Sequence, residues 1–118
     1  MIASTIYAQE KNEFEKHYEM KTYYMVFLKK GPNRNQDSLT VSKLQEQHIA
    51  HLTKMANEGK MDLAGPFMED GDIRGICVYN VGTKEEVEKL AKQDPAVIAG
   101  RLIVEIHPWY SAKGATLK

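Results

Sequence analysis

The chain has 118 residues, of which 42% are hydrophobic and 27% are charged, and its 16 basic and 16 acidic residues give a formal net charge of zero. This length suits one domain with a single core. The balanced charge argues against nucleic-acid binding, which normally needs a basic excess, and no apolar run approaches the roughly 18 residues of a membrane span. We therefore expect a soluble domain whose partner is a small molecule or another protein.

The first 21 residues differ from the rest of the chain because charged side chains dominate them. Tyr7, Phe14 and Tyr18 are spaced by seven and four positions, which suits one face of a short helix. The opening six residues are too short and polar for a signal peptide, and they are compatible with a cytoplasmic protein or with an exported one after trimming. We predict an N-terminal extension (residues 1–21), a domain (residues 22–110) and a C-terminal tail (residues 111–118).

Residues 22–28 predict the first strand of the domain, because aromatic and β-branched residues are typical of strands. Tyr23, Met25 and Phe27 form one alternating set, and the residues between them are also apolar or aromatic. A strand that is apolar on both sides needs to be covered on both sides. Residues 31–37 are rich in residues that break regular structure, so they predict a linker.

The next segment predicts a long helix. Ser42 and Gln45 have the spacing of a capping box and mark its expected start, and Gly59 marks its end because glycine readily takes the left-handed conformation of a helix terminus. At about 100° per residue, His48 lies in the middle of the apolar stripe and His51 at its edge. The stripe itself consists of Val41, Leu44, Leu52 and Met55.

Two strands are expected after this helix, at residues 61–64 and 73–81. The first ends at Gly65 and Pro66, which favour a turn. Each contains residues suited to a strand, and a turn of Asp and Gly connects them.

A second helix and a last strand complete the domain. Thr83 and Glu86 form a second capping box, and Asp94 before Pro95 ends the helix because proline disfavours the helical conformation of the residue before it. Residues 101–107 predict the last strand.

The resulting β-α-β-β-α-β order is that of an α+β ferredoxin-like sandwich. We expect a four-stranded antiparallel sheet with both helices on one face. Because the first strand is apolar on both sides, the second face predicts self-association into a homodimer.

This topology brings two titratable residues to the same end of the sandwich. His48 lies in the helix that starts there, and Asp94 lies where the second helix finishes. A histidine oriented by a carboxylate can act as a general base or acid, since the carboxylate fixes the tautomer and stabilises the imidazolium. A core histidine and a helix-ending turn residue are the simpler interpretations of these two residues.

Several short motifs occur in an order and spacing in which the chain resembles the YCII-related family. They are His48-Ile49-Ala50-His51-Leu52, Glu58-Gly59-Lys60-Met61, Ala64-Gly65-Pro66, Asp94-Pro95, Ala99-Gly100 and Pro108-Trp109. The resemblance covers about residues 22–110. It implies a dimeric ferredoxin-like fold related to muconolactone isomerase, and a pocket histidine and aspartate that correspond to His48 and Asp94. Ala96 departs from the pattern, because an aromatic residue often follows the Asp-Pro pair, and it predicts an altered pocket.

The resemblance also points to a function, since an enzymatic relative in that family eliminates chloride from a chlorinated hydroxyquinol. We predict a cofactor-independent lyase or isomerase that moves a proton on a small hydroxylated or lactone-like compound, with His48 and Asp94 as the catalytic pair. The alternatives are a non-catalytic small-molecule-binding or accessory module and a dimeric scaffold without a ligand. The predicted substrate-binding residues are Tyr24, His51, Gly65, Pro66 and Arg74.

Other site types have weaker support in the sequence. Cys77 is the only cysteine, so an intrachain disulfide is excluded and a buried packing role is favoured. His48 and His51 have no nearby third ligand in the sequence, and we predict no metal site. The third strand also lacks the aromatic signature of an RNA-recognition domain.

Overall fold

The computed structural model describes residues 12–118. Residues 23–109 form one compact unit, and both ends of the chain contribute to a second unit, of which residues 12–22 and 110–118 are described. Tyr7, which the sequence places on a helix with Phe14 and Tyr18, lies outside the described residues.

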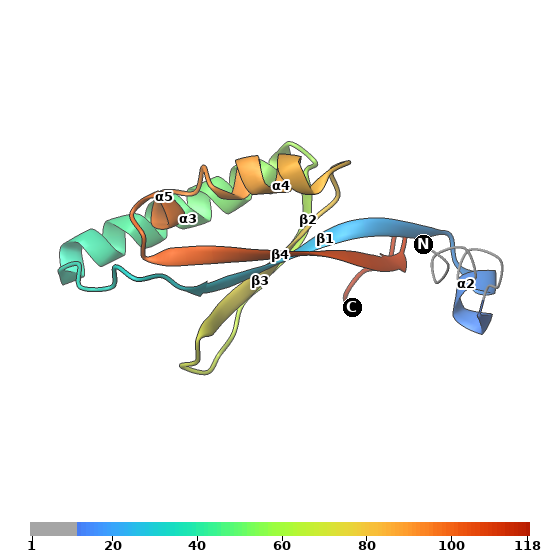
Figure 1. The fold of residues 1–118 in the computed structure, drawn as a ribbon, viewed down its shortest axis with the longest axis horizontal. Coiled ribbons are helices and arrows are strands. Elements are labelled where there is room, and N and C mark those ends of the chain that lie inside the picture. Colours follow the sequence, from blue (N-terminus) through green and yellow to red (C-terminus); the bar gives the residue numbers. More distant parts are fainter. Residues whose placement is uncertain (1–11) are drawn as a thin grey trace. The chain divides into compact units, whose positions relative to one another are not determined.

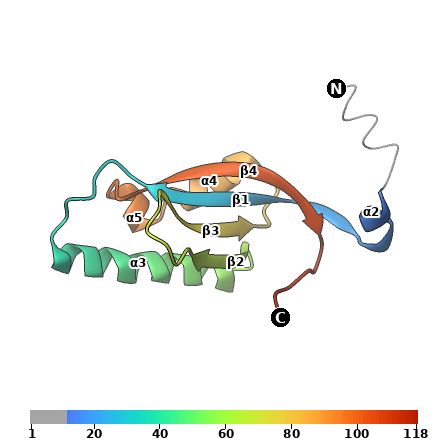
Figure 2. The ribbon, with the colours of Figure 1, turned by 90° about the horizontal axis from the view of Figure 1, so that it is seen from below.

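The sheet has four strands in the order β2-β3-β1-β4, which Figure 2 shows side by side. Antiparallel pairing joins β1 to β3, with Val26 opposite Cys77, and joins β2 to β3. The strand order leaves β2 and β4 at the two edges. The strands are β1 (Met20–Lys30), β2 (Met61–Pro66), β3 (Ile73–Tyr79) and β4 (Leu102–Ala112).

The helices of residues 23–109 lie on one face of this sheet, as Figure 1 shows. The long helix α3 (Ser38–Asn57) packs against β2 and against the short helix α5 (Pro95–Ile98), and α4 (Lys84–Ala91) precedes α5. The predicted α+β ferredoxin-like arrangement is therefore confirmed, with one more short helix than expected.

The core lies between the helices and the sheet. Its side chains come from alternating positions of the strands and from the inner faces of α3 and α4, as expected for side chains that alternate across a strand. Thr83 caps α4 by accepting a hydrogen bond from the Glu86 N–H group, as the capping box predicts. The buried cluster consists of Val26, Leu28, Met55, Met61, Cys77, Tyr79, Val87, Leu90 and Ile106.

The start of α3 differs from the prediction. The helix begins at Ser38, because the Asp37 side chain accepts a hydrogen bond of 2.8 Å from the Thr40 N–H group and caps the first turn. Aspartate is among the strongest N-cap residues, so the helix begins five residues earlier than predicted, directly after the predicted linker. Ser42 and Gln45 lie inside the helix, and their capping-box prediction was wrong. The end is as predicted, with Gly59 at a φ of 74°.

The observed strand boundaries differ from the predicted ones at prolines and turns. The β2 strand includes Gly65 and Pro66, the β3 strand ends at Tyr79, and β4 continues through Pro108 to Ala112. Proline lacks an N–H group and is tolerated in edge strands, where that position can face away from the sheet. Because β2 and β4 are the edge strands, β2 can include Pro66 as its last residue and β4 can continue past Pro108.

The described part of the terminal unit contains helix α2 (Glu13–His17), capped by the Asn12 side chain. Phe14 and Tyr18 stack with ring centroids 4.6 Å apart, but Tyr18 follows the helix as its extended C-cap residue, so the two do not share a helix face as predicted. The Lys113 N–H group donates a 2.7 Å hydrogen bond to the Glu19 carbonyl. Among residues 12–118, none of the helices combines the length and the apolar character that crossing a membrane requires.

Candidate active site

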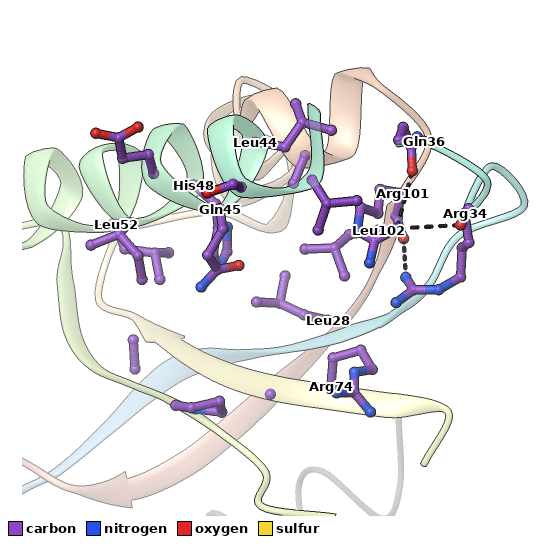
Figure 3. A pocket seen from close by; sticks show the side chains of 18 of the residues that line it. Leu28, Arg34, Gln36, Leu44, Gln45, His48, Leu52, Arg74, Arg101 and Leu102 are labelled. Carbon is purple, nitrogen blue, oxygen red and sulfur yellow. Dashed lines mark hydrogen bonds between the residues drawn. The ribbon is translucent and has the colours of Figure 1, made fainter. Parts of the chain in front are cut away.

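A cavity of about 1130 Å³ lies between α3 and the sheet, large enough for a small organic molecule. Figure 3 shows its lining, in which Leu28 comes from the sheet and Leu44, His48 and Leu52 come from α3. Ala96 and Leu102 add to the wall from α5 and β4. Apolar side chains form much of the lining, and Arg, Gln, Ser, Glu and His side chains add polar groups to it, a mixture that suits an organic ligand with polar substituents.

His48 lines this cavity, and Asp94 lies behind it. The His48 Nδ1 atom and the Asp94 Oδ2 atom are 2.5 Å apart, although the residues are 46 positions apart in sequence. Both side chains are buried, with relative exposures of 11% and 3%. The proximity that the topology predicts for these two residues is present in the structure.

The short helix α5 holds the Asp94 carboxylate in place. Asp94 is the N-cap of this helix, and its Oδ1 atom accepts a 2.9 Å hydrogen bond from the Ala96 N–H group, while Oδ2 faces His48. Pro95 occupies the first helical position, where a missing N–H group costs nothing. Asp94 therefore follows α4 and caps the start of α5. Each of its carboxylate oxygens has its own partner, the Ala96 N–H group for Oδ1 and His48 for Oδ2.

This arrangement selects one tautomer of His48. A buried carboxylate accepts a hydrogen bond, so Nδ1 carries the proton and Nε2 keeps a lone pair. Within residues 12–118, Nε2 makes no hydrogen bond. The arrangement can take up a proton at Nε2, because the carboxylate then stabilises the positive charge on the ring.

His51 lies one turn further along α3 and is also buried. Burial lowers its pKa, the His48 ring lowers it further, and the Asp94 carboxylate opposes both effects. Its Nε2 atom is the only buried side-chain nitrogen or oxygen without a hydrogen-bond partner among the described residues. His51 is not part of the cavity lining.

The other predicted binding residues divide into two groups. Gly65, Pro66 and Arg74 line the cavity, whereas Tyr24 packs against the core and does not line it. The Arg74 guanidinium donates to the Asp70 carboxylate and to two carbonyls of the β2–β3 turn. Binding roles for all of these residues stay predictions.

The sequence interpretation missed a polar cluster at one end of the cavity. Figure 3 shows Arg34, Gln36 and Arg101 together at the end away from Leu52. The Arg34 Nη1 atom donates to the Arg101 carbonyl at 2.6 Å, and the Arg101 Nη1 atom donates to Gln36 Oε1 at 3.1 Å. The pairs are more than 60 residues apart and lie in loops, where periodicity gives no signal.

Two further titratable groups lie beneath the site. Burial and the nearby Asp94 charge raise the pKa of Cys77 to about 12, and burial raises the pKa of Tyr79. Cys77 is therefore a thiol at neutral pH and a poor nucleophile. Within residues 12–118, no three His, Cys, Asp or Glu side chains gather in a way that could hold a metal ion.

Comparison with known proteins identifies a matching family model and a solved structure with a similar fold. The family model of the YCII-related domain matches residues 22–110, which include the whole cavity lining. The solved structure of 5-chloro-2-hydroxyhydroquinone dehydrochlorinase from Burkholderia phenoliruptrix AC1100, in complex with 2,5-dihydroxybenzoquinone, is similar with a TM-score of 0.56 and 22% identity. The similarity covers 74% of this chain and 92% of that chain. No curated protein sequence matches significantly.

Proposed function

Because this chain belongs to the family of YCII-related domains, and because His48 lines the cavity while it is paired with the buried Asp94 behind it, we propose that it is a cofactor-independent lyase or isomerase acting on a small hydroxylated or lactone-like compound. The hydrogen bond between His48 and Asp94 is the observation that carries the proposal. A structurally similar protein is a dehydrochlorinase of a hydroxylated aromatic ring, which supports elimination as the reaction type.

In the proposed reaction, His48 is the general base. Its Nε2 atom takes a proton from a hydroxyl group of a keto tautomer of the substrate, and the O–H electron pair becomes a carbonyl bond. The adjacent C=C electron pair shifts by one bond, the leaving group departs from the neighbouring sp3 carbon with its bonding pair, and the imidazolium then releases its proton to solvent. Asp94 accepts the Nδ1–H hydrogen bond throughout and stabilises the imidazolium. In an isomerase, Nε2 returns the proton to a different substrate atom, so no external acid, oxidant or reductant is needed.

We also propose that two copies of the chain pair through the sheet face opposite the helices. Within residues 23–109, all of the helices lie on the other face (Figure 1). By strand alternation, Phe27 and Ile103 belong to the uncovered face, and Ile103 is 45% exposed. A large apolar sheet face is a common self-association surface.

The first experiment tests turnover directly. The wild-type protein is incubated with 5-chloro-2-hydroxyhydroquinone and with a panel of small hydroxylated aromatic compounds and lactones, and chloride release and product formation are followed. His48→Ala should lower the rate by about 10²- to 10⁴-fold, the usual contribution of a general base. His107→Ala, which removes an exposed histidine, should leave the rate unchanged.

A thermal-shift screen with the same panel separates catalysis from binding. A compound that raises the melting temperature and is also consumed supports the proposal. If compounds bind to the cavity but none is converted, the chain is a small-molecule-binding module and the proposed reaction is wrong.

A further inference from the structure

The polar end of the cavity carries more positive than negative charge. Three arginines line the cavity, Arg34, Arg74 and Arg101, whereas the only carboxylate among the lining residues is Glu46, which is exposed on α3. Arg74 is paired with Asp70 at 3.1 Å. Arg34 and Arg101 form no ion pair with any carboxylate of residues 12–118.

The two unpaired arginines keep most of their donors free. A guanidinium has five N–H donors. In Arg34 the Nη1 atom donates to the Arg101 carbonyl, and in Arg101 the Nη1 atom donates to the Arg34 carbonyl and to Gln36. The Nε and Nη2 groups of both side chains have no acceptor among the described residues.

Keeping these two charges together has an electrostatic cost. Partial burial is the main cause that lowers the pKa of Arg34, and the positive charges of Arg101 and Arg74 lower it further. The negative charge of Asp70 raises this pKa and so opposes the other effects. The guanidinium stays protonated in a protein, so the repulsion between the two side chains persists at neutral pH. A bound anion would relieve it, and a guanidinium matches a carboxylate with two parallel hydrogen bonds.

Resting on the function proposed above, we propose that Arg34 and Arg101 bind the carboxylate of a small organic acid, at the end of the cavity away from Leu52, while His48 faces the reacting hydroxyl group. Gln36 orients Arg101 through its Oε1 atom. The substrate class is then a hydroxylated acid, and these two arginines distinguish it from neutral compounds of the same shape.

Two probes that differ only at the proposed contact test this inference. Binding of 2,5-dihydroxybenzoate and of its neutral amide, 2,5-dihydroxybenzamide, is measured by calorimetry at pH 7 and at two salt concentrations. The acid should bind at least about tenfold more tightly than the amide, the ratio expected for charge-assisted hydrogen bonds, and only its affinity should fall with salt. Equal affinities in the wild-type protein would overturn the inference without any variant.

Variants then locate the contact. Arg34→Gln and Arg101→Gln should each reduce the affinity for the acid at least about tenfold while leaving the affinity for the amide unchanged. Lys43→Gln changes the net charge equally at an exposed position of α3 outside the cavity lining, and it should change neither affinity. An equal loss for both probes would mean that the arginines only hold the loops together, and it would overturn the inference.

Acid selectivity and turnover are measured separately, so the carboxylate site and the proposed reaction can fail independently. Binding is also measured in His48→Ala, in which turnover is not expected. If selectivity for the acid persists while no member of the panel is converted by the wild-type protein, the carboxylate site stands and the proposed reaction fails. If conversion occurs without selectivity for the acid, the carboxylate site is wrong and the reaction stands.

Discussion

Asp94 has two separable roles because each of its oxygens has a different partner. Oδ1 accepts the Ala96 N–H group at the start of α5, and Oδ2 faces His48. Asparagine caps helices about as well as aspartate, but its amide group cannot accept the Nδ1–H bond with the strength of a carboxylate. The substitution Asp94→Asn therefore preserves the cap and disturbs only the pair.

We predict that Asp94→Asn lowers turnover by at least about 100-fold, since a histidine in the wrong tautomer loses its function as a base. Asp94→Ala should lower turnover as well and cost about 1 kcal/mol more in the free energy of unfolding, because it also removes the cap. Turnover and urea unfolding of both variants measure the two effects. Equal stability of the two variants would show that the cap contributes nothing.

His51 makes a different prediction, about stability and pH. Burial lowers its pKa in the folded state, whereas the unfolded chain has the ordinary value of about 6.5. Between these values the unfolded state binds more protons, so the free energy of unfolding falls as the pH drops below about 6.5. The charged and titratable groups that influence His51 are Asp94, His48 and Lys54.

We expect His51→Asn to flatten this part of the stability profile. Urea unfolding between pH 5 and pH 8, in steps, gives the slope for the wild type and the variant. His17→Asn, at an exposed position in α2, should keep the slope of the wild type. A slope that survives in His51→Asn would assign the proton uptake to another group.

At the scale of the elements, the junction between β1 and α5 positions the two arginines of the cavity. The Gly31 N–H group donates to the Arg101 carbonyl at 2.8 Å, and the Asn33 N–H group donates to the Gly100 carbonyl at 2.9 Å. A Cβ atom on Gly31 would lie 2.1 Å from the Gly100 oxygen. The backbones approach this closely only because residue 31 has no side chain.

Gly31→Ala should therefore separate the two loops and destabilise the fold by about 1–3 kcal/mol, the usual cost of overpacking. It should also weaken binding of 2,5-dihydroxybenzoate, since Arg34 and Arg101 follow the two backbones. The same substitution at Gly82, where an added Cβ meets nothing within 4 Å, is the matched control. Urea unfolding and calorimetry measure the two effects, and wild-type values for Gly31→Ala would contradict the predicted clash.

The elements differ in how far the sequence determines them. Periodicity and caps predicted the four strands, α4 and the end of α3, because those signals are local. The predicted start of α3 was wrong because Asp37 and Ser42 are both good N-cap residues. Only the tertiary position of the preceding loop decides which of them caps the helix. Helix α5 has four residues, too few for a periodic pattern, so it could not be predicted.

At the scale of the whole domain, topology explains why half of the candidate site could be predicted. The β-α-β-β-α-β order alone brings the helix with His48 and the end of the second helix together, so their proximity follows from connectivity. Arg34 and Arg101 come together through loop conformation, with Gly31 packed against Gly100. The pattern of strands and helices that is predicted from the sequence contains no information on the contact between Gly31 and Gly100.

The proposed homodimer is a property of the whole domain, and Ile103 tests it. Glutamate at this position places a charge on an apolar sheet face at little cost to the isolated chain, because the side chain is already 45% exposed. We predict that the wild type sediments as a dimer of the 13.4 kDa chain and that Ile103→Glu sediments as a monomer.

The control is the same change on the helical side of the sheet. Ile98→Glu in α5, where the side chain is 72% exposed, should remain a dimer, so a general effect of the added charge is excluded. Circular dichroism on both variants establishes that the fold is intact. Lys29 and Glu105 lie 3.6 Å apart on the same strands as Phe27 and Ile103. A kosmotropic salt such as ammonium sulfate should nevertheless strengthen the interface, because such salts favour burial of the apolar side chains. A wild-type chain that is monomeric at micromolar concentration would exclude the proposed dimer. Dimers that persist in Ile103→Glu would place the interface on another surface.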